Sequence, residues 1–90
     1  MKRTEILTEL RNLMVDKCIG PSDSKKITES ASLIDDLDMD WLYKIELVME
    51  LEEYFGIDIR DEDADRWLTI GDAVGYLEKM KVKKPAAAKA

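Results

Sequence analysis

The first segment of the chain has the spacing of apolar residues that is typical of an amphipathic helix. From residue 3 to about residue 17, apolar side chains recur at intervals that place them on one helical face. They are Ile6, Leu7, Leu10, Leu13 and Met14. Gly20 and Pro21 are expected to stop this helix, and residues 20–26 are expected to form a polar loop.

The strongest helical pattern covers residues 41–55, with Asp40 in a suitable N-cap position and Gly56 as a natural C-terminal stop. Two apolar stripes run along it. The first is the predicted core face, Leu47, Val48, Leu51 and Phe55, and the second is a partly exposed stripe, Leu42, Ile45 and Met49. Glu46, Glu50 and Glu53 recur beside the second stripe. This helix therefore has more apolar surface than one core contact needs.

The segment between these helices is mostly irregular. Its expected inward anchors are Ile27, Leu33, Ile34 and Leu37. Ser32 and Asp35 have the spacing of a capping box, which predicts a short turn.

In the C-terminal third, the sequence pattern predicts a short extended piece, then a helix of one or two turns that begins at Asp61, and a last helix over about residues 70–80. Thr69 and Asp72 have capping-box spacing at its start. Its expected inner face is Ala73, Tyr76, Leu77 and Met80, and Gly71 and Gly75 are expected to weaken it.

Together these elements predict an all-α fold, a small bundle of three main helices and one short helix. Residues 1–80 would form a single domain, and the basic run at 81–90 a disordered tail. Ninety residues allow one small domain with a modest core.

Charge is distributed unevenly, and this narrows the classes of partner. The net charge is −6, but residues 29–65 hold 14 acidic and 2 basic residues, a local net charge of −12. Such a block repels nucleic acid. It either attracts basic protein surfaces or is only a solvated face that keeps the protein soluble, and composition alone favours the second. No apolar run is long enough to span a membrane, and a soluble, cytoplasmic monomer is expected.

The residue types that most enzymes use are scarce. The chain has no histidine and a single cysteine, Cys18, which excludes the common zinc sites and every histidine-based triad. Cys18 is either a reactive thiol or a small apolar residue near a helix end. The spacing Asp36-x-Asp38-x-Asp40 is similar to a calcium loop, but Trp41 replaces the required glycine and Leu47 the bidentate glutamate. No enzyme and no metal site are predicted.

The central sequence resembles the acyl carrier proteins of type II fatty acid and polyketide synthesis. Similarity runs without a gap from about residue 27 to residue 77. It includes Ala31-Ser32, Asp36-Leu37, Asp40, Leu42, Glu46-Leu47-Val48-Met49, Leu51-Glu52-Glu53, Phe55, Ile59, Asp61-Glu62, Ala64, Thr69, Ala73 and Tyr76. The resemblance implies a four-helix carrier that shuttles thioester-linked acyl chains between fatty acid, polyketide or lipid biosynthesis enzymes, on a 4′-phosphopantetheine arm attached to a serine.

Two residues depart from the family pattern at the attachment site. Trp41 stands at the serine position, and an indole has no nucleophilic oxygen that could take the arm. Asp38 stands where the family usually has glycine. Ser30 and Ser32 lack the sequence context of an attachment site. No phosphopantetheine is therefore expected on this sequence, whether Trp41 is a natural residue, an engineered one or an anchor for a partner.

Two sets of residues have roles implied by the resemblance. A partner-binding face would dock basic surfaces of acyl-processing enzymes or of phosphopantetheinyl transferases, and comprises Asp40, Leu42, Ile45, Glu46, Met49, Glu50, Glu52 and Glu53. An internal gap for an acyl chain would be lined by Ile34, Leu47, Leu51, Ile59, Ala64 and Trp67. Trp67 either fills that gap or is simply core packing. Two functions remain open: an acyl carrier that has lost its serine, and an arm-less acidic module that docks partners through its second helix.

Overall fold

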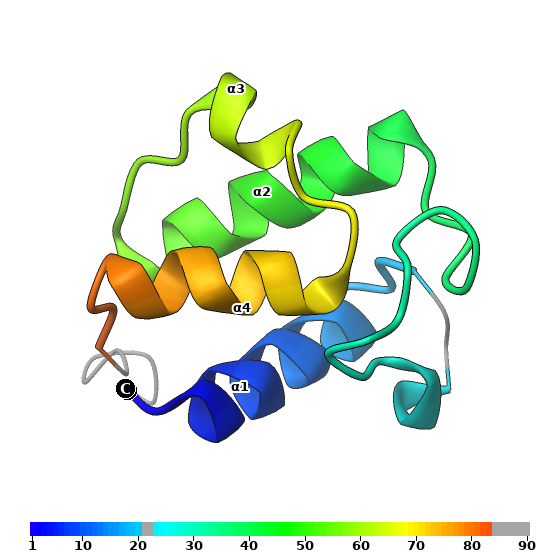
Figure 1. Ribbon diagram of the computed structural model, residues 1–90, viewed down its shortest axis with the longest axis horizontal. Coiled ribbons are helices and arrows are strands. Elements are labelled where there is room, and N and C mark those ends of the chain that lie inside the picture. Colours follow the sequence, from blue (N-terminus) through cyan, green and yellow to red (C-terminus); the bar gives the residue numbers. More distant parts are fainter. Residues whose placement is uncertain (21–22, 84–90) are drawn as a thin grey trace.

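The computed structural model describes residues 1–20 and 23–83, and over these ranges the chain is a small helical bundle (Figure 1). In chain order the elements are α1 (Arg3–Asp16), the short 3₁₀ helix η1 (Ser24–Lys26), α2 (Trp41–Phe55), α3 (Asp61–Ala64) and α4 (Ile70–Lys79). The predicted all-α fold is confirmed. None of the helices described is long and apolar enough to cross a membrane.

The core lies between α1, α2 and α4, with α1 and α4 packed side by side (Figure 1). Its fully buried members come from each of these helices and from the irregular segment, and they include Ile6, Leu10, Met14, Ile27, Leu33, Met39, Leu47, Leu51, Ile70, Val74 and Leu77. The predicted inner faces of α1 and α2 are therefore largely confirmed. Phe55 and Tyr76 only pack partly against the core, and Met80 is exposed.

The segment from residue 27 to 40 is held by backbone hydrogen bonds to the start of α4. Leu33 N–H donates to Leu68 O over 2.9 Å, and Ile70 N–H donates to Ala31 O over 3.1 Å. An isolated antiparallel bridge joins Ser32 to Thr69. Two stretches far apart in the sequence thus form one wall beside the N-terminal end of α2.

Glycine is needed at position 71 because of close packing, and not because it favours the helix. Its N–H donates to Glu29 O over 2.8 Å, and a Cβ at this position would lie 2.9 Å from that same oxygen. Only glycine allows the two backbones to approach so closely. Arg3 strengthens the contact, since its guanidinium donates to both Glu29 and Gly71 O.

Two local predictions are corrected. Helix α1 ends at Asp16, before Gly20, because Cys18 takes a left-handed conformation (φ 56°) and Ile19 N–H closes the turn on Met14 O. In the turn that starts at Ser32, the reciprocal carboxylate is Asp36 rather than Asp35. Asp35 contributes only its N–H, which donates to the Ser32 hydroxyl.

Packing extends beyond the domain boundary expected at residue 80. Lys81 has a positive φ (55°), which turns the chain back, and Val82 is buried. The N-terminal ammonium of Met1 donates to Val82 O over 3.3 Å. Residues 84–90, the rest of the predicted tail, lie outside the described residues.

Candidate functional site at the start of α2

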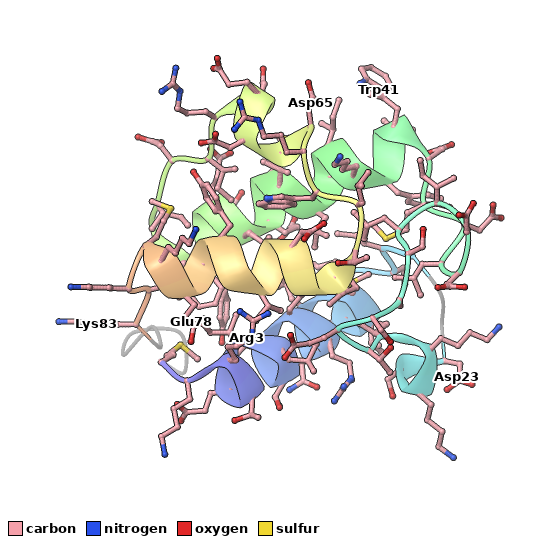
Figure 2. All side chains as sticks on the ribbon, in the orientation of Figure 1. Arg3, Asp23, Trp41, Asp65, Glu78 and Lys83 are labelled. Atoms are coloured by element: carbon pink, nitrogen blue, oxygen red, sulfur yellow. The ribbon has the colours of Figure 1, made fainter. Side chains whose placement is uncertain are left out.

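Position 41 is the first residue of α2, and its side chain extends from the edge of the molecule (Figure 2). The predicted N-cap is confirmed: the Asp40 carboxylate accepts the N–H of Tyr43 over 3.1 Å. The Trp41 side chain is 74% exposed. Whatever residue occupies this position is therefore presented to solvent at a capped helix start.

The turn before α2 retains a backbone conformation that suits glycine. Asp38 has φ 53°, in the left-handed region that glycine enters freely and that aspartate tolerates better than most residues. The next residue, Met39, is buried, and its N–H donates to Leu33 O over 2.8 Å. A left-handed residue thus precedes buried Met39 at the position where the resemblance implies a glycine.

The predicted partner-binding residues mostly lie on the outer side of α2. Leu42, Ile45 and Met49 are exposed, as are the carboxylates of Asp40, Glu46 and Glu53. Glu50 is half-buried. Glu52 differs, because its carboxylate turns back to accept the N–H of Ile59 over 2.8 Å. Glu52 thus fixes the chain after α2 and is less available to a partner than its neighbours.

The residues assigned to an acyl gap divide into two groups. Leu47, Leu51, Ile59, Ala64 and Trp67 are buried in the core. Ile34 is 70% exposed, so the expectation that it points inward is wrong. The other three predicted inward anchors of this segment, Ile27, Leu33 and Leu37, are buried as expected. Trp67 packs edge-on against Tyr76, with ring centroids 5.6 Å apart.

Two cavities flank Trp41. The first, of about 460 Å³, lies between α2 and α3 and is lined by Trp41, Lys44, Ile45, Val48, Met49, Glu52, Asp61, Ala64 and Asp65. The second, of about 490 Å³, is named the Trp41 cleft; it is lined by Ser32, Leu33, Ile34, Asp35, Met39, Asp40, Trp41, Lys44, Asp65, Trp67, Leu68 and Thr69. Trp41, Lys44 and Asp65 belong to both, so they form the partition between the cavities.

Lys44 holds this partition in place. Its ammonium donates to Trp67 O over 3.1 Å, which ties α2 to the loop before α4. Sequence reasoning missed Lys44, Met39 and Leu68. One signal in the sequence could have identified Lys44 as a site residue: it is one of only 2 basic residues between residues 29 and 65.

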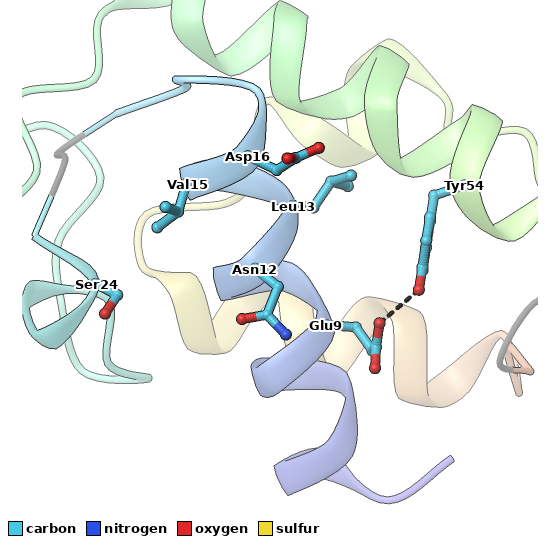
Figure 3. Close-up of a pocket in the computed structure, with 7 residues that line it drawn as sticks. All are labelled: Glu9, Asn12, Leu13, Val15, Asp16, Ser24 and Tyr54. Carbon is cyan, nitrogen blue, oxygen red and sulfur yellow. Dashed lines mark hydrogen bonds between the residues drawn. The ribbon is translucent and has the colours of Figure 1, made fainter. Parts of the chain in front are cut away.

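A larger cavity, of about 700 Å³, lies elsewhere, between α1 and the end of α2 (Figure 3). There the Tyr54 hydroxyl donates to the Glu9 carboxylate over 2.5 Å. This hydrogen bond, and then partial burial, raise the pKa of Tyr54 to about 12. The contact joins α1 to α2, and no residue of this cavity was predicted to belong to the functional site.

No family model matches the chain, but curated relatives do. The chain is 45% identical over 76 residues to the acyl carrier protein of Sinorhizobium fredii. Its identity to the acyl carrier protein AcpP of Rhizobium meliloti is also 45% over 76 residues. Each alignment covers 84% of this chain and 95% of the relative. The chain belongs to the acyl carrier protein family. This is a family of carriers rather than enzymes, and the predicted resemblance is confirmed.

The family implies a 4′-phosphopantetheine group, and the residues around position 41 do not fit it. The attachment needs a hydroxyl, whereas the indole of Trp41 offers only an N–H donor. Ser32 is not at a helix start, and its hydroxyl accepts the N–H of Asp35 within the turn. Ser30 lies in the preceding loop, 3.4 Å from Thr28 in a hydroxyl–hydroxyl contact. Neither serine stands in the capped helix-start position of Trp41.

Proposed function

We propose that the chain is a docking domain of the acyl carrier protein family that works without a phosphopantetheine arm. It would present the outer side of α2 to basic surfaces of the enzymes that modify or use acyl carriers. The observation that carries the proposal is the position of Trp41, an exposed indole at a capped helix start where a carrier needs a hydroxyl. The names of the relatives also support a carrier role, which one substitution at position 41 could restore.

The charge distribution supports docking to a basic partner. Glu46 and Glu53 are exposed on α2, beside the apolar side chains of Leu42 and Met49. Carboxylates at the rim of an interface mainly accelerate association, and apolar side chains then slow dissociation. The outer side of α2 offers both kinds of contact on one rigid helix.

The first test is the intact mass of the protein after incubation with coenzyme A and a broad-specificity phosphopantetheinyl transferase. This chain and its Trp41→Ser variant are treated side by side. We expect only Trp41→Ser to gain one phosphopantetheine, because the variant restores the hydroxyl on an otherwise unchanged frame. Modification of the unaltered chain would contradict the arm-less assignment. Failure of both to react would mean that the transferase does not dock here.

A second test addresses the docking face itself, in the Trp41→Ser background. Glu46→Lys with Glu53→Lys should slow modification by about 10-fold at low ionic strength and flatten its salt dependence. A matched control, Asp16→Lys with Asp23→Lys, makes the same change of net charge on α1 and the loop after it. Equal slowing by both pairs would show that net charge, rather than the α2 face, governs association.

A further inference from the structure

The mouth of the Trp41 cleft is formed by three large apolar side chains that face solvent. Ile34 is 70% exposed, Trp41 74% and Leu68 69%. Each comes from a different part of the chain, and all three line the same cavity of about 490 Å³. Single exposed apolar residues are ordinary, but three around one hollow indicate a binding surface.

The cleft is apolar at its floor as well as at its mouth. Leu33, Met39 and Trp67 line it and are buried, with side-chain exposures of 2%, 1% and 4%. A hollow of this shape suits an apolar side chain, because such a group would exchange water for apolar contacts on every side.

The walls of the cleft are fixed rather than loose. Leu68 O accepts the N–H of Leu33, and Leu68 N–H donates to the Asp72 carboxylate over 2.8 Å. Thr69 N–H donates to the same carboxylate over 3.1 Å. Both the N–H and the C=O of Leu68 are therefore hydrogen-bonded, which fixes the backbone that carries its exposed side chain. Little conformational entropy would be lost when a partner binds there.

Charge selects among the apolar groups that could enter. Asp35, Asp40 and Asp65 line the cleft, against one cation, Lys44, whose ammonium already donates to Trp67 O. A fatty acid would bring its carboxylate to this acidic rim and be repelled. A second copy of the chain, related by a two-fold axis, would bring the same rim against itself. A protein segment with Lys or Arg beside an apolar anchor fits both the rim and the floor.

From these observations we infer that the Trp41 cleft is the anchor site for a basic protein segment, which inserts one apolar side chain between Ile34, Trp41 and Leu68. The inference rests on the docking role proposed above and places its main apolar contact at the N-terminal end of α2 and the adjoining loops. The stripe of Leu42, Ile45 and Met49 along α2 is then secondary.

The test is a titration of the ¹⁵N-labelled chain with a short amphipathic peptide of leucine and lysine, followed by the two indole N–H signals. The signal of exposed Trp41 should shift, while that of buried Trp67 reports that the fold is intact. A matched peptide of leucine and glutamate should not bind. Affinity for the lysine peptide should fall steeply between about 0.01 M and about 1 M salt, where screening becomes almost complete.

Three variants locate the contact. Leu68→Ser and Ile34→Ser should each weaken binding of the lysine peptide by about 10-fold, as expected for a buried anchor contact. Met49→Ser, an exposed apolar residue on the α2 stripe, should change it by less than about twofold. Because all three side chains are more than half exposed, the variants should fold normally.

Other outcomes overturn the inference in distinguishable ways. If Met49→Ser weakens binding as much as Leu68→Ser does, the α2 stripe is the main contact and only the docking proposal survives. Equal binding of the glutamate peptide removes the charge argument. A Trp41 shift with dodecanoate but not with the lysine peptide would make the ligand an apolar carboxylate. If the chain alone shows a molecular mass in solution that rises with its concentration, and the Trp41 signal shifts, the occupant of the cleft would be a second copy of the chain.

The mass test of Trp41→Ser separates this inference from the proposed function. If that variant is modified and the lysine peptide does not bind, the cleft assignment fails and docking stands. If that variant is not modified and the lysine peptide does not bind, both proposals fail.

Discussion

The two sides of α2 differ in how far their apolar residues are removed from water. On the inner side, Leu47 and Leu51 are completely buried against the core. On the outer side, Met49 is 58% exposed although it lies only two residues from each of them in sequence. Burial of apolar surface stabilises the folded state, whereas exposed apolar surface contributes only when a partner covers it. The stability of the chain and its proposed function therefore depend on opposite sides of one helix.

The largest expected effect is a contrast in stability between these sides. Leu51→Ala should lower the free energy of unfolding by about 3 kcal/mol, because it removes buried methyl groups and leaves a cavity. Met49→Ala, its neighbour on the outer side, should change it by about 0.5 kcal/mol or less. Denaturant-induced unfolding of the two variants measures the contrast. Similar losses would mean that the outer stripe is also part of the stabilising core.

A smaller effect concerns the hydrogen bond between α1 and the end of α2. Tyr54→Phe should cost about 1 kcal/mol at neutral pH, because it leaves the Glu9 carboxylate without this donor. The raised pKa means that the neutral hydroxyl is favoured in the folded state, so its contribution is complete below pH 10 and is lost as the pH approaches about 12.

Unfolding measured over this alkaline range should therefore show the unaltered chain losing more stability than Tyr54→Phe. The two curves should converge near pH 12. Parallel curves would indicate that Tyr54 ionises at the same pH in the folded and unfolded states.

The smallest expected effect tests the turn that leads into the outer side. Asp38→Gly should raise the free energy of unfolding by about 0.5 kcal/mol, since it relieves a left-handed conformation at a non-glycine residue. Asp35→Gly, in the same turn but without a positive φ, should lower it by about 0.5 kcal/mol. Thermal unfolding of both variants gives the comparison. A loss in both cases would mean that Asp38 stabilises its own turn through its side chain.

The long helices could be predicted from sequence because each combines a periodic apolar face with a clear start or stop. Helix α2 has the predicted bounds, since Asp40 caps its start and Gly56 accepts the left-handed conformation at its end (φ 66°). Helix α4 begins where the Thr69–Asp72 capping box indicated. In these segments local signals and tertiary packing favour the same structure.

The irregular segment could not be predicted in the same way. The apolar character of Ile34 predicts an inward position, but a turn has no fixed period to decide which of its apolar residues face the core. Buried Met39 was missed for the same reason. The Trp41 cleft depends on the pairing of Leu33 with Leu68, a long-range contact that no local pattern encodes. The attachment position was found by resemblance alone.

The pairing of Leu33 with Leu68 also makes ligand binding and folding a single equilibrium. One wall of the cleft exists only when two distant stretches of chain have come together, so an unfolded chain has no equivalent surface. A ligand that binds there must shift the population toward the native state. A partner present at about 100 times its dissociation constant would add about 2.7 kcal/mol to the free energy of unfolding. Such a partner would raise the melting temperature of this small domain, and it could be found by heating mixtures before its identity is known.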